Sequence, residues 1–209
     1  MHQSPPGPVT GAVFFDIDGT LVTGTSSGSF LAQRLGHATE VDEAEARYAA
    51  GAIDNHEVCA VDARGWAGTQ RTQIDSWLED LPLIDGIRQT VGWCRSHDLV
   101  PVLASLAWEP VGVHLARRFG FAGHCGPQLQ MTAGNYTGDV SVSFDEFDKR
   151  DFALGVCDAL GVASPQCGER REGLALQRRV IRVVLAVYRV WAPRPAAHAE
   201  QDRALAHDA

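Results

Sequence analysis

The stretch Val13-Phe14-Phe15-Asp16-Ile17-Asp18-Gly19-Thr20-Leu21-Val22 decides the fold of this chain. Its three leading apolar residues predict the end of a buried strand. Asp18-Gly19 predicts a turn directly after that strand. Two carboxylates, Asp16 and Asp18, therefore lie where the strand ends. Because ligands bind at the C-terminal ends of strands in open α/β sheets, the stretch predicts an α/β fold with a ligand site here.

The spacing of the two carboxylates suits covalent phosphoryl chemistry. Asp16 can act as a nucleophile and carry an aspartyl-phosphate. Asp18 can protonate the leaving alcohol and later activate water, and a neighbouring carboxylate favours the protonated form that this requires. Gly19 allows the backbone to approach a phosphate closely, and Thr20 can donate a hydroxyl hydrogen bond. The alternative is a surface turn after an ordinary strand, but the complete run is much rarer than such turns.

The stretch resembles motif I of the haloacid dehalogenase (HAD) superfamily. An acid at the position of Asp18 is typical of the phosphatases and phosphotransferases of that superfamily. The resemblance implies Mg²⁺ as cofactor, held by the side chain of Asp16 and the backbone carbonyl of Asp18. It also implies a three-layer, Rossmann-like α/β core with a small helical C1 cap between motifs I and II, as in the phosphoserine-phosphatase-like branch.

Length, charge and cysteine content limit the class of protein. A chain of 209 residues can bury a real core. A net charge of −8 argues against a general nucleic-acid binder. The five cysteines are scattered and show no paired metal-ligand spacing, which fits a reduced, cytoplasmic setting. The first residues lack the basic and apolar regions of a signal peptide, and membrane association is not expected.

The pattern along the chain predicts a core interrupted by a cap. Residues 1–10 are a disordered lead, residues 11–23 and 82–165 form the core, and residues 24–81 form the helical cap. Within the cap, Asp54-Asn55-His56-Glu57 predicts a helix start. Four cap residues could face a phosphate ester: His56, Arg64, Trp66 and Arg71.

Two further residues occupy the positions of HAD motifs II and III. Ser105 follows the apolar run Leu99–Ala104, a predicted strand, and can donate a hydrogen bond to a phosphoryl oxygen; the alternative is a helix N-cap. Lys149 begins a predicted helix that continues to Leu160, and it is the only lysine in the chain. Its ammonium would pair with Asp16 and the phosphate, whereas the alternative is a solvated lysine in an acidic run.

Motif IV, which completes the Mg²⁺ site in the superfamily, is not recognisable. No apolar strand precedes Gly168-Glu169, and Glu169 is the candidate metal ligand near the expected place. Residues 166–209 are basic and atypical. Three interpretations stay open: a divergent helix that covers the sheet, a basic amphipathic segment for a membrane surface or partner, or a shifted reading frame.

The sequence predicts a Mg²⁺-dependent phosphatase of a small phosphorylated metabolite. Asp16, Asp18 and Lys149 are the catalytic candidates, and Ser105, Thr20 and Gly19 are the substrate-binding candidates. The branch suggests phosphoserine, but the cap residues do not specify a substrate. Two alternatives are a phosphate-binding protein without a complete metal site and a phosphotransferase with an alcohol acceptor.

Overall fold

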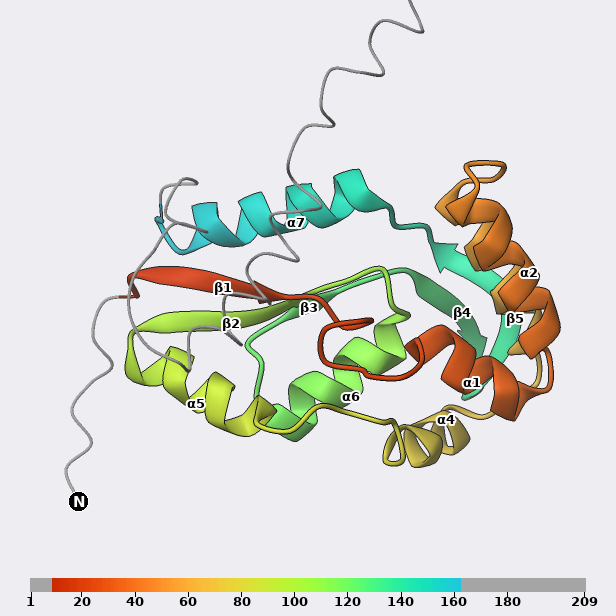
Figure 1. The fold of residues 1–209 in the computed structure, drawn as a ribbon, viewed down its shortest axis with the longest axis horizontal. Helices are drawn as coiled ribbons and strands as arrows, with labels where there is room; N and C mark the ends of the chain where they lie inside the picture. The colour runs from red at the N-terminus through yellow and green to blue at the C-terminus, as the bar shows by residue number, and fades with distance from the viewer. Residues whose placement is uncertain (1–8, 163–209) are drawn as a thin grey trace, which may run out of the picture.

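The computed structural model of the chain describes residues 9–162 (Figure 1). Five helices follow the first strand before the second strand begins, and three strands follow one another before the last described helix. In chain order the elements are β1 (Gly11–Phe15), α1 (Ser27–Leu35), α2 (Ala38–Ala49), α3 (Asn55–Gly65), α4 (Arg71–Leu78), α5 (Ile87–Ser96), β2 (Leu99–Ala104), α6 (Glu109–Phe119), β3 (His124–Cys125), β4 (Gln128–Thr132), β5 (Asn135–Val142) and α7 (Glu146–Ala159).

A parallel sheet with the strand order β1-β2-β3 forms the centre of the core. Phe15 lies opposite Leu103 of β2, and Leu103 lies opposite His124 of β3. The first two strands therefore end side by side at the same edge of the sheet. This register brings the residues after β1 next to the residues after β2, although the helical insertion separates them in sequence.

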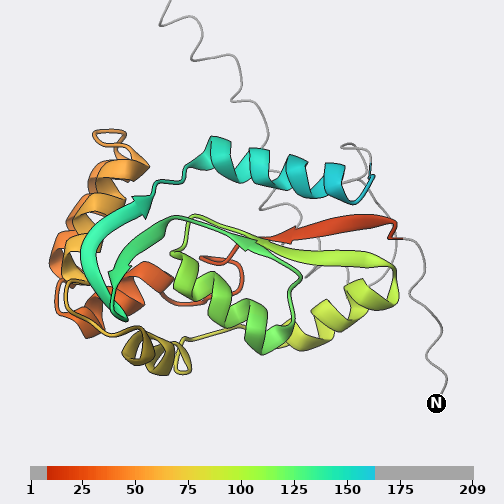
Figure 2. The ribbon, with the colours of Figure 1, turned by 180° about the vertical axis from the view of Figure 1, so that it is seen from behind.

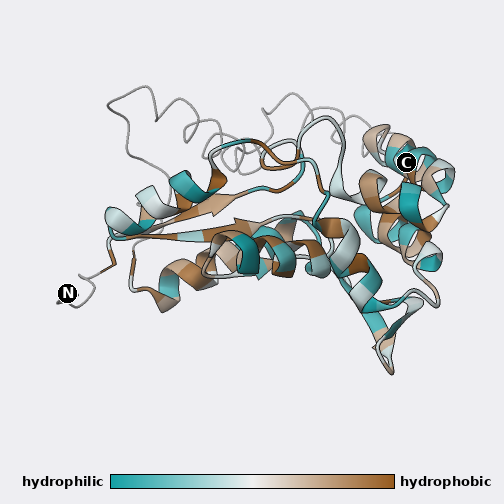
Figure 3. Cartoon of the chain, turned by 90° about the horizontal axis from the view of Figure 1, so that it is seen from below, coloured by the Kyte–Doolittle hydropathy of each residue, from teal (hydrophilic) through white to brown (hydrophobic). Residues whose placement is uncertain are grey.

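Helices cover both faces of this sheet (Figures 1 and 2). Side chains alternate along β1, because successive residues of a strand point to opposite faces. Val13 and Phe15 belong to the apolar cluster that includes residues of α5 and α6, whereas Ala12 and Phe14 pack with residues of α7. The brown colour of the strands in Figure 3 shows the same apolar centre. The predicted three-layer α/β core is confirmed.

Helices α1 to α4 lie at one end of the sheet, over the C-terminal ends of its strands (Figure 1). The predicted helix start at Asp54 is confirmed: its side chain accepts from the N–H of Glu57, and Glu57 bonds back to the N–H of Asp54. The antiparallel hairpin β4-β5 packs against α3, and the rings of Trp66 and Tyr136 lie 5.0 Å apart in an edge-to-face contact. The hairpin thus helps to hold the helical region, although its sequence falls within the predicted core segment.

Within the described residues, no helix is both long and apolar enough to cross a membrane. The prediction of an atypical basic segment at residues 166–209 lies outside the described residues.

Candidate active site

Asp16 lies at the C-terminal end of the fully buried strand β1. Its Oδ1 accepts a 2.9 Å hydrogen bond from the backbone N–H of Ile17. The turn that follows requires Gly19, whose φ of +72° falls in the left-handed region that favours glycine. The N–H groups of Leu21 and Val22 then bond to the carbonyl of Ile17. A rigid strand and a tight turn therefore hold the carboxylate of Asp16 in place.

Lys149 forms an ion pair with Asp16, with 3.4 Å between Nζ and Oδ2. The lysine side chain comes from α7, whose first turn is fixed by a capping box between Asp145 and Asp148. Lys149 is only 5% exposed. A buried ammonium needs a partner of opposite charge, which Asp16 supplies. The pair places one positive charge where a phosphate would approach Asp16.

Asp18 connects the turn after β1 with the start of the helical region. Its two carboxylate oxygens accept hydrogen bonds from the backbone N–H of Ser27 at 2.6 Å and from the Ser27 hydroxyl at 3.0 Å. Burial is the main cause that raises the pKa of Asp18 above its ordinary value of 3.8; the bonds from Ser27 oppose this shift, and the charge of Asp16 adds to it. A raised pKa suits a carboxyl group that must hold a proton for part of a reaction.

Ser105 lies directly after β2 and is 1% exposed. Its Oγ accepts a 3.2 Å hydrogen bond from the backbone N–H of Ala107. This bond leaves the hydroxyl proton available to donate to another group. Since β1 and β2 end side by side, Ser105 and Asp16 border the same space.

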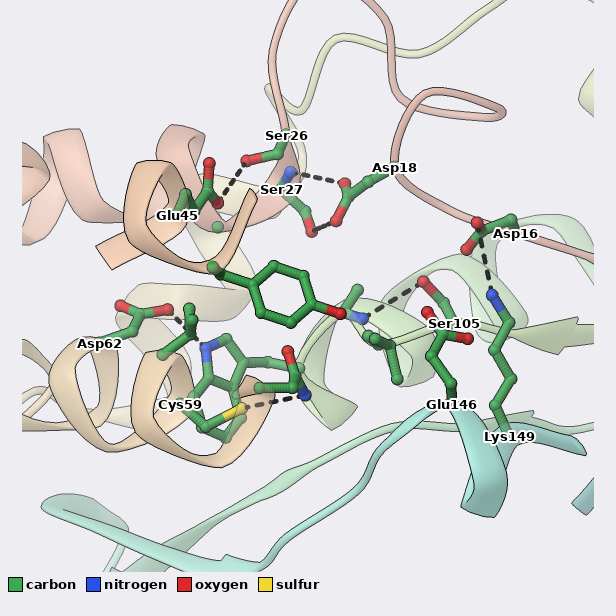
Figure 4. Close-up of a pocket in the computed structure, with 17 residues that line it drawn as sticks. Asp16, Asp18, Ser26, Ser27, Glu45, Cys59, Asp62, Ser105, Glu146 and Lys149 are labelled. Carbon is green, nitrogen blue, oxygen red and sulfur yellow. Dashed lines mark hydrogen bonds and ion pairs between the residues drawn. The ribbon is translucent and has the colours of Figure 1, made fainter. Parts of the chain in front are cut away.

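The four residues Asp16, Asp18, Ser105 and Lys149 line one cavity of about 380 Å³ (Figure 4). The ends of β1 and β2 and the start of α7 form the floor of this cavity. The helical region formed by α1, α2 and α3 provides its far wall. The other lining residues are Ser26, Ser27, Gly28, Glu45, Tyr48, Asn55, Val58, Cys59, Asp62, Leu106, Ala107, Trp108 and Glu146.

The structure does not bring every predicted residue to this cavity. Gly19 is exposed and Thr20 lies beside it on the turn, and neither lines the cavity. The same holds for four cap residues that the sequence analysis considered: His56, Arg64, Trp66 and Arg71. Trp66 is instead fully buried in the apolar core. Glu169 lies outside the described residues.

Several cavity residues were not predicted. Ser27 and Glu45 come from the helical region, where a sequence without tertiary contacts gives no signal for them. Glu146 was detectable in principle, because it precedes Lys149 by three residues and such pairs share one face of a helix. The Oε2 atom of Glu146 is buried and has no hydrogen-bond partner in the described part of the chain.

The oxygen atoms at the floor of the cavity are of the kind that Mg²⁺ prefers. Protein sites for this ion supply one or two carboxylates and leave the remaining positions to waters and substrate phosphates. Asp16 provides one carboxylate, and the unpaired Oε2 of Glu146 provides another oxygen at the same cavity. Residues 9–162 contain no cluster of three or more His, Cys, Asp or Glu side chains that could hold a metal. The donors present therefore fit Mg²⁺ only together with waters and a bound phosphate.

Asp62 lies on the far wall of the cavity and links the helical region to the core (Figure 4). It is 5% exposed and accepts three hydrogen bonds. His37 and Trp66 donate to Oδ1 at 2.7 and 3.2 Å, and Trp108, which follows β2, donates to Oδ2 at 2.6 Å. The bond with Asp62 is the main cause that raises the pKa of His37 above its ordinary value of 6.5.

Replacing Asp62 with Asn will lower the free energy of unfolding by about 3 kcal/mol, because an amide cannot accept from all three donors and a buried charge pair is lost. Folding raises the pKa of His37, so the pair stabilises fully below pH 6.5 and loses its effect as the pH rises through the folded-state pKa. Urea unfolding at several pH values measures this cost, which should shrink toward alkaline pH. A pH-independent cost would contradict the account. Trp108→Phe removes one donor only and should cost less.

Comparison with solved structures shows which fold this is. The chain superimposes on a HAD family hydrolase from Salmonella enterica serovar Typhi with a TM-score of 0.69 at 15% identity. It superimposes on a phosphoserine phosphatase bearing a phospho-aspartyl intermediate analogue with a TM-score of 0.65 at 16% identity, and on a probable phosphoserine phosphatase from Vibrio cholerae with 0.64 at 15%. The chain therefore has the fold of this HAD family hydrolase and of these phosphoserine phosphatases, as the sequence motif predicts.

The matches cover 77%, 74% and 88% of this chain, respectively. The chain spans 55% of the length of the Salmonella hydrolase, 74% of the phosphoserine phosphatase and 69% of the Vibrio protein. The sequence matches no model of a known protein family. It also matches no curated protein.

Proposed function

We propose that this chain hydrolyses a small phosphate monoester with Mg²⁺ as cofactor and a covalent phosphate on Asp16. One observation carries the proposal: a single cavity at the C-terminal edge of the sheet is lined by Asp16, Asp18, Ser105 and Lys149. Each of these residues has a role in phosphoryl transfer that its position supports. The fold, shared with HAD phosphatases, agrees with this assignment.

In the first step Asp16 attacks phosphorus. A bond forms between its carboxylate oxygen and phosphorus while the ester P–O bond breaks on the opposite side. Asp18 donates its proton to the departing oxygen, which leaves as an alcohol. Lys149 and the hydroxyl of Ser105 stabilise the charge on the equatorial phosphoryl oxygens.

In the second step water releases the phosphate. Asp18, now ionised, takes a proton from a water molecule as the oxygen of that water bonds to phosphorus. The bond between phosphorus and Asp16 breaks, which restores the carboxylate and frees inorganic phosphate. The hydrogen bonds from Ser27 hold Asp18 in position for both proton transfers.

Mg²⁺ would be held by the side chain of Asp16 and the backbone carbonyl of Asp18, with the oxygen of Glu146 available at the same cavity. When bound, it supplies positive charge that offsets the charge on the phosphate oxygens and on the attacking carboxylate. Lys149 performs part of this neutralisation from the opposite element, α7.

Hydrolysis of p-nitrophenyl phosphate by the full chain tests the proposal. The protein is stripped with EDTA and Mg²⁺ is then titrated back. We expect turnover that saturates with Mg²⁺ and is absent without it. Lys149 is the one lysine or arginine that lines the cavity in residues 9–162, and its charge is already offset by Asp16, so the phosphate charge needs a further cation. A folded protein without turnover at any Mg²⁺ concentration would contradict the proposal and favour a phosphate-binding protein. A phosphorylated product that appears only with an added alcohol would identify a phosphotransferase.

A further inference from the structure

The cavity has two ends of different chemistry, and the second end points to a class of substrate; this inference rests on the proposed function. The floor carries Asp16, Ser105 and Lys149, which suit a phosphate. The opposite wall comes from α1, α2 and α3 (Figure 4). When the phosphate of a substrate lies at the floor, that wall faces the alcohol part of the ester. Its residues therefore decide which leaving alcohol fits.

The far wall carries two acids but no lysine or arginine among the described residues, and the only one of the two acids with an ion-pair partner is Asp62, which pairs with His37. Lys149 is the single Lys or Arg side chain lining the cavity in residues 9–162, and it is already paired with Asp16 at the floor. Glu45 and Asp62 line the wall. A leaving group with a carboxylate, as in phosphoserine, would meet the like charge of Glu45 there without an arginine or lysine to bind it.

Glu45 and Asp62 differ in the hydrogen bonds that their carboxylate oxygens accept. Asp62 accepts three hydrogen bonds from His37, Trp66 and Trp108 and serves as a structural anchor. Within residues 9–162, Glu45 accepts only one contact, from the hydroxyl of Ser26 at 3.5 Å, which is at the limit of a hydrogen bond. Partial desolvation, together with the charges of Asp18, Asp42 and Asp62, raises the pKa of Glu45. A cationic group beside Glu45 would offset the repulsion between its carboxylate and these neighbouring acids.

An aromatic ring accompanies Glu45. Tyr48 follows it by three residues on α2, which places both side chains on one face of the helix, and both line the cavity. A carboxylate next to an aromatic ring binds an ammonium group by charge and by cation–π attraction. Cys59 on the same wall does not compete as an anion, because burial raises the pKa of its thiol to about 12.

We propose that the substrate is the phosphate monoester of a short amino alcohol, with its ammonium group bound by Glu45 and Tyr48 and with no carboxylate. Glu45 is then a specificity-determining residue of the cavity. The phosphate of such an ester lies at Asp16 and Lys149, and its cation lies at the wall formed by α2.

The test compares three esters: phosphoethanolamine, phosphoserine, which differs from it by one carboxylate, and 2-hydroxyethyl phosphate, which lacks the cation. We expect kcat/KM for phosphoethanolamine to exceed that for each of the other two by about tenfold or more, the effect of one charge-assisted contact. Glu45→Gln should lower kcat/KM for phosphoethanolamine by about tenfold and reduce its advantage over phosphoserine. Glu43→Gln removes the same charge from α2. Both glutamates are exposed, but Glu43 does not line the cavity, so its replacement should leave the preference unchanged.

Two controls separate this inference from the proposed function. Hydrolysis of p-nitrophenyl phosphate reports the chemistry without a cationic leaving group, and its absence would count against the proposed function alone. Dissociation constants of the same three esters with the Asp16→Asn variant, measured by calorimetry, report recognition without turnover. Phosphoserine bound or hydrolysed as well as phosphoethanolamine, or a preference that Glu45→Gln leaves unchanged, would overturn the assignment.

Discussion

Replacing Asp16 with Asn will lower kcat for p-nitrophenyl phosphate by a factor on the order of 10⁴ or more. The amide cannot form the bond to phosphorus, and loss of a nucleophile removes most of the rate enhancement of enzymes that react covalently. The variant should be less stable than the wild type, because buried Lys149 loses the charge of Asp16. The local backbone contact is kept, since Oδ1 of an asparagine can still accept the hydrogen bond from the N–H of Ile17. Initial rates with saturating Mg²⁺ measure the effect.

Asp80→Asn provides the matched control for this variant. Asp80 is exposed and does not line the cavity, so the same change of charge there should leave kcat within about twofold. Circular dichroism and thermal melting of both variants exclude loss of structure as the cause. An Asp16→Asn protein that is folded and retains activity near that of the wild type would refute the assignment of the nucleophile.

Replacing Asp18 with Asn will lower steady-state kcat by about 10²- to 10⁴-fold, the usual contribution of a general acid–base group. The two steps should respond differently to p-nitrophenyl phosphate. Nitrophenolate leaves without protonation, so the phosphate still reaches Asp16. Water is then activated poorly, because the amide cannot take its proton. We therefore expect a rapid release of about one equivalent of nitrophenolate, followed by slow turnover.

Rapid-mixing absorbance records this burst, and the Asp16→Asn variant supplies the control in which no burst should occur. Ser27 bonds to both oxygens of Asp18, so part of that contact remains with asparagine. Equal loss of the burst and of steady-state turnover would contradict a role in the second step. Wild-type turnover would contradict any role of Asp18 as acid or base.

The sequence predicted the core because its signals are local. Three apolar residues followed by Asp16, and six largely apolar residues followed by Ser105, are strand patterns that need no tertiary context. Lys149 could be placed because α7 starts at a capping box and because the chain has no other lysine. The resemblance to one motif then supplied the fold class, a Rossmann-like core with a helical cap.

The cavity wall could not be predicted, because it depends on how the helices pack. Glu45 reaches the cavity through the position of α2 against α1 and α3. Nothing in an Ala- and Glu-rich helix distinguishes it from Glu43, which is also exposed but does not line the cavity. From the sequence alone, Asp62 would be taken for a surface acid. It is buried, and its hydrogen-bond donors His37 and Trp108 lie 25 and 46 residues away in the sequence. Trp66 was a candidate for phosphate contact and proved to be core.

Trapping of the covalent intermediate tests the central claim most directly. The wild-type protein is mixed with p-nitrophenyl phosphate and Mg²⁺, quenched with borohydride and digested for peptide mass spectrometry. An aspartyl-phosphate is an acyl phosphate, and borohydride reduces it to homoserine. The account predicts homoserine at position 16, more of it in Asp18→Asn, where the second step is slow, and none in Asp16→Asn. Turnover without modification at position 16, or modification at another carboxylate, would contradict it.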